Sequence, residues 1–195
     1  MPVTEYFENA MRIISASVAS LDAAAFERLA GECAEAARGG GRIIASGLGK
    51  NVPVCEKFVG TLNSLGARAA FLHTNSAMHG DLGIVREGDV VLLLSKSGGT
   101  AETLELLGHL ERKRAKVWGV SFGGGGELAR RCRDSILLEL EHEGDPWDIM
   151  PNNSTAVYLI VLQGLAMRLA GMLGVTLAQF GENHPGGKIG ERLGG

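Results

Sequence analysis

The segment DVVLLLSKSGGTAETLELLGHLERKR, residues 89–114, contains the pattern that decides the fold. It begins with the apolar run DVVLLLS (89–95), which is typical of a strand buried on both faces of a sheet. It ends in an amphipathic stretch from about Thr100 to Arg114, which predicts a helix. A buried strand that leads through a glycine turn into a helix indicates an α/β protein with a parallel sheet.

The same alternation extends in both directions along the chain. We predict further strands at 42–46, 67–72, 116–122 and 135–140, with helical segments between them. Helical spacing of apolar residues predicts two helices within 4–38, with Asp22 as the N-cap of the second and the glycines at 39–41 as its end. A long apolar helix is expected at about 154–173, followed by a short helical piece and a glycine-rich tail. The chain therefore reads as one domain, with N-terminal helices at 4–38, an α/β core at 42–173 and a tail at 176–195.

Composition and charge exclude several classes of protein. The 195 residues are 45% hydrophobic and 21% charged, as expected for a globular protein, and the net charge of −3 argues against general nucleic-acid binding. Gln163 and Arg168 interrupt the apolar helix, which we expect in the core or at a subunit interface rather than in a membrane. The N-terminus lacks the features of a secretory signal. The three scattered cysteines predict reduced, structural thiols, and we expect a cytoplasmic protein.

The turn SKSGGTAE (95–102) is suited to binding a phosphate. Ser95, Ser97 and Thr100 offer hydroxyl groups, and Gly98 and Gly99 allow a ligand to approach the backbone closely. Thr100 is expected at the start of a helix, where free N–H groups and the helix dipole favour an anion. The structural alternative is a hydroxyl-rich helix cap that binds only water.

A second glycine turn, SGLGKN (46–51), follows the first predicted strand. Its G-x-G suggests a dinucleotide fold, but the third glycine position of that motif falls at Val52 and no acidic residue follows at the customary distance. The spacing of a Walker A loop is absent as well. We therefore do not expect a dinucleotide cofactor.

Three further motifs extend the pattern: MHGDLG (78–83), EGDP with PNNST behind it (143–155), and NHPGGKIGERL (183–193). Together with GLGK and SKSGGTAE they resemble the arabinose-5-phosphate isomerase family of the sugar isomerase (SIS) domain superfamily, in order and spacing over about residues 40–193. This resemblance implies a three-layer α/β/α sandwich with a five-stranded parallel sheet. It also implies a homo-oligomer, commonly a tetramer, whose active sites are shared between neighbouring subunits.

The resemblance implies an activity as well. The family interconverts D-ribulose 5-phosphate and D-arabinose 5-phosphate, which is a precursor for lipopolysaccharide and for some capsules. Many members carry a pair of CBS domains after the SIS domain, and because the sequence ends at Gly195 we expect the form without them.

Residues can be assigned to the family's site by motif. The resemblance implies catalytic roles for Lys50, Glu102, Glu143 and His184, the last of these in the tail. The substrate-binding residues that we expect are Ser46, Asn51, His79, Ser95, Lys96, Ser97, Gly98 and Thr100. The chain departs from the family pattern in its loop S-K-S-G-G-T, in Asn51 where a hydroxyl is common, and in PNNST. These departures leave the acid–base positions intact but leave the choice of sugar open.

Isomerisation requires proton transfer between neighbouring carbons through a cis-enediol, with no redox cofactor. Glu143 and then His184 are our candidates for this transfer, and we expect closure of an apolar-edged loop to raise the pKa of Glu143. Lys50 would stabilise the enediolate oxygen, and Glu102 would orient a sugar hydroxyl or Lys50.

Each candidate residue also has a structural interpretation. Glu102 could serve only the helix dipole, Lys50 and Glu143 could be solvated surface charges, and His184 could be a turn residue. For His79 we favour such a role, an imidazole–carboxylate bond to Asp81 that orients a loop.

Two other functions remain open on sequence grounds. One is a sugar-phosphate sensing module without catalysis, and the other is an isomerase of a hexulose or heptulose phosphate on the same fold. No metal-ligand spacing such as H-x-x-x-H is present, so we expect no obligatory metal and no other cofactor. The expected partner is a small-molecule sugar phosphate.

Overall fold

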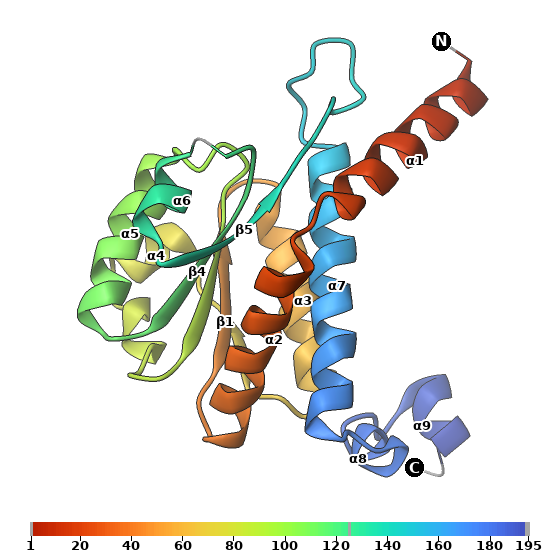
Figure 1. The fold of residues 1–195 in the computed structure, drawn as a ribbon. Helices are drawn as coiled ribbons and strands as arrows, with labels where there is room; N and C mark the ends of the chain where they lie inside the picture. Colours follow the sequence, from red (N-terminus) through yellow and green to blue (C-terminus); the bar gives the residue numbers. More distant parts are fainter. Residues whose placement is uncertain (1, 125, 194–195) are drawn as a thin grey trace.

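The computed structural model describes residues 2–124 and 126–193 and contains a parallel sheet covered by helices on both faces (Figure 1). Its five strands are β1 (Ile43–Gly47), β2 (Ala69–Phe71), β3 (Val90–Leu94), β4 (Lys116–Phe122) and β5 (Asp134–Leu138). They lie in the order β2-β1-β3-β4-β5, and every neighbouring pair is parallel. The predicted three-layer α/β fold is confirmed.

Alternating residues of the strands build two cores. On one face, Ile43, Val90 and Leu92 pack under α2 (Ala23–Arg38), α3 (Asn51–Ser64) and α7 (Asn153–Leu173). On the other face, Ile44, Val91 and Leu93 pack under α5 (Ala101–Arg112), α6 (Glu127–Arg131), the short α4 (Thr74–Ala77) and the 3-10 turn η1 (Asp81–Ile84). Because both faces are covered, the strands read as nearly continuous apolar runs in the sequence.

The N-terminal helix α1 (Val3–Ala19) contacts α7 and extends away from the rest of the chain (Figure 1). Asp22 caps α2 as predicted, because its side chain accepts a hydrogen bond from the backbone N–H of Ala24 at 2.8 Å. Along α1, the large apolar side chains of Val3, Phe7 and Met11 are more than half exposed. This helix therefore presents an apolar face that the described chain does not cover.

The long helix α7 has the length and apolar composition of a membrane-spanning segment. Nine of its residues are nevertheless buried, and it packs against α1, α2 and α3. Tyr158, near its start, is fully buried and donates a hydrogen bond from its hydroxyl to the carbonyl oxygen of Val120 in β4. The helix therefore packs in the core on one side, as one of the two predicted places requires, while Ile160 and Met167 remain about half exposed. The other predicted place, a subunit interface, stays a prediction.

The cysteines and tryptophans divide between core and surface. Cys33, Cys55 and Cys132 are buried free thiols, and burial raises the pKa of Cys55 to about 12 and that of Cys132 to about 11. Structural thiols were predicted for all three. Trp118 in β4 is 1% exposed and donates a hydrogen bond to Glu32, whereas Trp147 is 69% exposed.

The chain ends in α8 (Leu177–Glu182) and α9 (Gly187–Leu193), which lie beyond the C-terminal end of α7 (Figure 1). We had expected only a glycine-rich tail after α8, and this was wrong for 187–193. Gly190 lies within this helix, and a Cβ there would lie 2.6 Å from the carbonyl oxygen of His184, so a glycine is needed for α9 to pack against the preceding turn.

Candidate active site at the carboxyl edge of the sheet

Two glycine turns leave the sheet from neighbouring strands. β1 and β3 lie side by side, and their last residues, Gly47 and Leu94, are register partners. The chain then turns to α3 on one face after β1 and to α5 on the other face after β3. This is the point at which the strand order reverses, and ligands of open α/β sheets bind in the crevice there.

The β3–α5 turn has the chemistry of an anion cradle. The hydroxyls of Ser95 and Thr100 lie 2.9 Å apart, and Ser97 accepts a hydrogen bond from the backbone N–H of Gly99. Thr100 is the N-cap of α5, but its side chain makes no capping hydrogen bond, so the first N–H groups of this 12-residue helix remain available. Ser97 is exposed and Thr100 half-buried, whereas Ser95 is buried and reaches a ligand only through Thr100. Free N–H groups at a helix N-terminus together with the hydroxyls of Ser97 and Thr100 favour a phosphate.

Contacts from the β4–α6 segment brace this turn from behind. Leu128 donates a backbone hydrogen bond to Gly98 at 2.7 Å, and Phe122 donates one to Lys96 at 3.0 Å. A Cβ at Gly126 would lie 2.7 Å from the carbonyl oxygen of Ser97, so this backbone approach requires glycine. Gly98 has a φ of +63°, a conformation that also favours glycine. The turn is thus held in one shape before any ligand arrives.

The β1–α3 turn places a cation beside the cradle. Lys50 is exposed and is the residue that precedes α3. Asn51, the first residue of α3, donates a hydrogen bond from its side chain to the carbonyl oxygen of Leu94, at the end of β3. Asn51 therefore ties the two turns together, while the ammonium group of Lys50 remains available.

One expected substrate contact and one expected structural bond are not supported by the geometry. Ser46 is fully buried and its hydroxyl lies 3.0 Å from that of Thr74, so it joins β1 to α4 and has no surface for a ligand. The expected bond between His79 and Asp81 is also wrong, since no hydrogen bond or ion pair joins these two described residues. His79 is exposed instead, in the turn between α4 and η1.

Glu143 is the most constrained group of the site. Its side chain has no exposed surface, and one carboxylate oxygen lies 2.7 Å from the ammonium nitrogen of Lys96 in the β3–α5 turn. The other oxygen accepts hydrogen bonds from the backbone N–H groups of Asn152 and Ser154, at the start of α7. Glu143 thus links the phosphate-type turn to the N-terminus of the central helix.

These contacts decide the protonation of Glu143. Burial alone pushes the pKa of this carboxyl upward, but the hydrogen bonds and charge of Lys96 and the hydrogen bonds of Ser154 outweigh it, so the pKa lies below the ordinary value. Our expectation of a raised pKa in a loop closed over substrate stays a prediction. The lowering by Lys96 was not foreseen, because the sequence did not show that Lys96 reaches Glu143. The carboxylate is ionised at neutral pH and already has partners on both oxygens.

Asp145 is a structural residue of this loop that the sequence analysis missed. Its carboxylate accepts hydrogen bonds from the backbone N–H groups of Trp147, Ile149 and Met150. These bonds fold residues 145–150 into a compact turn that leaves the side chains of Trp147 and Ile149 exposed. An aspartate directly before a proline in a glycine-containing loop is the signal that could have indicated such a turn.

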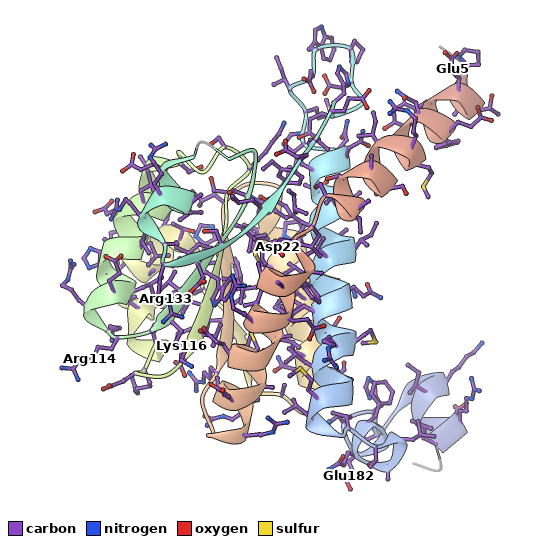
Figure 2. The ribbon with its side chains drawn as sticks, in the orientation of Figure 1. Glu5, Asp22, Arg114, Lys116, Arg133 and Glu182 are labelled. Carbon is purple, nitrogen blue, oxygen red and sulfur yellow. The ribbon has the colours of Figure 1, made fainter. Side chains whose placement is uncertain are left out.

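His184 lies apart from the other candidates within one chain. The side chain of its neighbour Asn183 donates a hydrogen bond to the carbonyl oxygen of Ser64, at the C-terminal end of α3, whereas Lys50 precedes the other end of that helix. The 14 residues of α3 span roughly 20 Å. Figure 2 shows Glu182, the neighbouring residue of α8, at the same remote end of the molecule. The imidazole of His184 stacks on Phe180 and contacts its carbonyl oxygen at 2.8 Å.

The remaining candidates are available to a ligand. Glu102 is exposed in the first turn of α5, and the side chain of Lys96 is 41% exposed. The structure therefore brings together Lys96, Glu143 and the turn 95–100. Lys50 and Glu102 lie at the starts of α3 and α5, the helices that follow the neighbouring strands β1 and β3. Within residues 2–124 and 126–193, no three His, Cys, Asp or Glu side chains converge as metal ligands.

Comparison with known proteins agrees with this geometry. Residues 38–168 match the family described as the SIS domain. The chain belongs to the SIS domain family. That matched range includes every candidate residue except His184 in the tail.

Several relatives of this SIS domain have names. Arabinose 5-phosphate isomerase KdsD of Pseudomonas aeruginosa is 38% identical over 157 residues, which are 80% of this chain and 48% of that protein. Arabinose 5-phosphate isomerase GutQ of Salmonella typhi is 33% identical over 153 residues, 78% of this chain and 48% of that protein. The chain spans about half the length of the curated relatives it matches. The predicted resemblance to arabinose-5-phosphate isomerases is confirmed.

A solved structure supports the same assignment. The structure of an Escherichia coli CFT073 protein in complex with arabinose 5-phosphate superposes with a TM-score of 0.86 and 29% identity, covering 94% of this chain and 95% of that one. The likeness therefore includes nearly the whole chain. A coverage of 94% leaves too few residues unmatched to omit α1, or α8 together with α9.

Proposed function

We propose that the protein is an aldose–ketose isomerase that interconverts D-ribulose 5-phosphate and D-arabinose 5-phosphate through a cis-enediol. The observation that carries this proposal is the hydroxyl-lined start of α5, with Lys96 and the buried carboxylate of Glu143 directly beside it. The isomerase names of two relatives and the arabinose 5-phosphate complex of a structural neighbour support this sugar.

The phosphate of the substrate would bind at the β3–α5 turn. Ser97, Thr100 and the free N–H groups of α5 would donate hydrogen bonds to its oxygens, and the braced backbone would need no rearrangement. A hydrogen bond to a charged group contributes roughly 1.5–3 kcal/mol, so several give useful affinity without an arginine cluster. The sugar chain would then extend toward Lys50 and Glu102.

Lys96 would connect phosphate binding to Glu143. A phosphate dianion in the turn attracts the partly exposed ammonium group of Lys96 and competes with Glu143 for it. Because Lys96 contributes to lowering the pKa of Glu143, its movement toward the phosphate would make this carboxylate more basic. Glu143 would thereby become a better proton acceptor only when substrate is bound.

The reaction itself needs one carbon proton and one oxygen proton to move. From the aldose, a base removes the proton on C2 while O1 gains a proton, which forms the cis-enediol. The proton on O2 then leaves as a proton is delivered to C1, and the ketose results. We assign the carbon transfer to Glu143 with His184, stabilisation of the negative oxygen to Lys50, and orientation of a hydroxyl to Glu102.

His184 could join this site only from a second copy of the chain. It lies at the remote end of α3 from Lys50, and the exposed apolar residues of α1 would be buried by a second copy. We therefore propose a homo-oligomer, a tetramer as the resemblance implies, in which the tail of one subunit completes the site of another. The location in the cytoplasm, the place in lipopolysaccharide or capsule synthesis and the role of His79 remain predictions from the sequence.

The test is conversion of ribulose 5-phosphate by the Glu143→Gln and His184→Ala variants. We expect each variant to lose about 10²-fold or more of kcat, the contribution typical of a general acid–base group. Glu139→Gln and His109→Ala, which remove exposed or partly exposed groups outside the site, are the matched controls. Full activity in both test variants would contradict the proposed roles of Glu143 and His184.

A panel of pentose, hexose and heptose phosphates, read by NMR, tests the function itself. Turnover of arabinose 5-phosphate alone is the expected result. Turnover of a longer sugar phosphate would correct the substrate, and binding without turnover of any sugar would make the protein a sensing module.

A further inference from the structure

A row of cations crosses the amino edge of the sheet, opposite to the candidate active site. Arg68 directly precedes β2, Arg42 directly precedes β1, and Lys116 is the first residue of β4. The strand starts are in register, since Ile43 pairs with both Ala69 and Val90, and Val90 pairs with Lys116. Arg86 belongs to the turn before β3, so adjacent strands β2, β1, β3 and β4 each contribute one cation to this edge.

These four cations line one pocket of about 560 Å³, which is within the range of small-molecule sites. The wall between them is the glycine stretch 39–41, which carries no side chain that could fill the space. Three strand spacings separate Arg68 from Lys116, or about 14 Å across the row. Figure 2 places the labelled Lys116 and Arg114 at this side of the molecule, near the turns that precede the strands.

The carboxylates of this pocket already have partners. Glu35 pairs with Lys116 and Glu87 with Arg114. Asp89 is 2% exposed and accepts hydrogen bonds from the backbone N–H groups of Arg42 and Arg86, one on each oxygen. Asp89 thus fixes the backbones of two arginines in place without contacting their side-chain charges.

The arginines, in contrast, have only neutral partners. The guanidinium of Arg42 donates to the carbonyl of Ile84, that of Arg68 to the carbonyl of Gly40, and that of Arg86 to the carbonyls of Gly83 and Val85. In the part of the chain that the structure describes, none of the three forms an ion pair. Three guanidinium groups without an ion-pair partner, held in position beside one pocket, form a site for an anion.

We propose that this pocket, the amino-edge arginine pocket, binds a small organic diphosphate. Guanidinium groups match phosphate geometry with paired hydrogen bonds, and three of them offer more donors than a single phosphate accepts, so two phosphates joined by one oxygen fit better than one. This site is separate from the carboxyl-edge cradle and does not depend on the function proposed for it.

The test is titration calorimetry with two probes, inorganic pyrophosphate and ADP. The titrations use the Ser97→Ala/Thr100→Val variant, which lacks two hydroxyls of the carboxyl-edge turn. Phosphate binding at that turn is thereby weakened and does not add to the measured heat. We expect one pyrophosphate per chain in this background and affinity about 100-fold weaker after Arg68→Gln/Arg86→Gln, about tenfold for each guanidinium removed. Tighter binding of ADP than of pyrophosphate would show that the pocket also takes the organic part.

Matched controls make the outcome decisive. Arg28→Gln/Arg131→Gln removes two arginines that pair with Asp134 and Glu127 outside the pocket, and should leave affinity unchanged. Arg68→Lys/Arg86→Lys keeps the charge and should bind pyrophosphate with intermediate affinity. If Arg68→Gln/Arg86→Gln fails to fold, this lysine variant tests the pocket in its place. The proposal would be overturned if the Arg68 and Arg86 variants bound pyrophosphate as tightly as their Ser97→Ala/Thr100→Val background, or if that background bound neither probe. In the native background, Arg68→Gln/Arg86→Gln should leave conversion of ribulose 5-phosphate unchanged, so failure of this site is distinct from failure of the isomerase.

Discussion

Glu143 shows how a single residue can join two parts of a site. Its fully buried carboxylate accepts hydrogen bonds from the N-terminal backbone of α7 and lies 2.7 Å from the ammonium nitrogen of Lys96. An ionised group in such a position is stable only because each oxygen has a partner. The stability of the folded chain and the chemistry proposed for the site therefore depend on the same carboxylate.

The first prediction concerns stability and pH. The pKa of Glu143 is lower in the folded chain than the ordinary value of 4.5, so the unfolded chain binds more protons in this range and stability falls as pH drops below about 4.5. We expect Glu143→Gln to lower the free energy of unfolding by about 1–3 kcal/mol at pH 7, and by less at acidic pH. Urea denaturation from pH 3.5 to 7 measures this difference. A difference that does not change with pH would contradict the assignment.

The second prediction concerns Lys96 in catalysis. Lys96→Met removes a cation beside the phosphate turn, so we expect KM for ribulose 5-phosphate to rise about tenfold or more. It also removes a cause of the lowered pKa of Glu143, so the acid limb of the kcat/KM profile should move to higher pH. Lys96→Arg should restore both quantities in part. Lys57→Met, which removes a lysine bonded to Gln163 on the helix surface, is the control.

The sequence indicated the site by residue type but not by contact. The turn 95–100 was predicted as a phosphate site because it has three hydroxyl groups and two glycines between a buried strand and a helix. The burial of Ser46 was not predictable, because it depends on the hydroxyl of Thr74 from a segment 28 residues away. The lowered pKa of Glu143 was not predictable for the same reason: Lys96 is distant in sequence and reaches Glu143 only in the fold.

At the level of elements, the β3–α5 turn depends on the β4–α6 segment behind it. Gly126 approaches the backbone of Ser97 and Gly98 so closely that no Cβ fits between them. The shape of the phosphate-type turn is thus determined by packing as well as by its own glycines.

The third prediction tests this support. A methyl group at Gly126 would lie 2.7 Å from the carbonyl oxygen of Ser97, so the turn must shift. We expect Gly126→Ala to cost about 1–3 kcal/mol of stability and to raise KM for the sugar phosphate more than it lowers kcat. Gly124→Ala is the control, because a Cβ there has nothing within 4 Å. Equal kinetics in the two variants would show that the turn does not need this contact.

The strands and long helices were predicted closely because both cores depend on continuous apolar runs. β4 has the predicted bounds, Lys116–Phe122, and the other strands differ by a few residues at their ends. The short elements α4, η1 and α9 were missed. Each has only four to seven residues and too few apolar side chains for a periodic signal, so its conformation depends on tertiary contacts.

On the scale of the whole molecule, the candidate residues are divided between two ends of the chain. Glu143 caps the start of α7, whereas His184 follows its other end, and the 21 residues of this helix span about 30 Å. A complete set of the proposed catalytic groups therefore requires a second subunit, and α1 offers an apolar face for it.

The fourth prediction follows from this division. Lys50→Ala and His184→Ala should each be nearly inactive, but mixed subunits should regain activity about 10²-fold above either parent, because some sites then contain both native groups. Phe7→Glu/Met11→Glu should lower the oligomer mass in light scattering and reduce activity with it, whereas Glu5→Gln should change neither. Lack of recovery in mixtures that have exchanged subunits would contradict the shared site.

The two tryptophans have a practical consequence for all these experiments. Trp118 is enclosed within the sheet, whereas Trp147 projects from the turn that Asp145 organises, a few residues from Glu143. Their emission should differ in wavelength and in access to a soluble quencher, so the protein contains two native optical probes. One reports on the integrity of the interior, and the other reports on the loop that the proposed function expects to respond to a sugar phosphate.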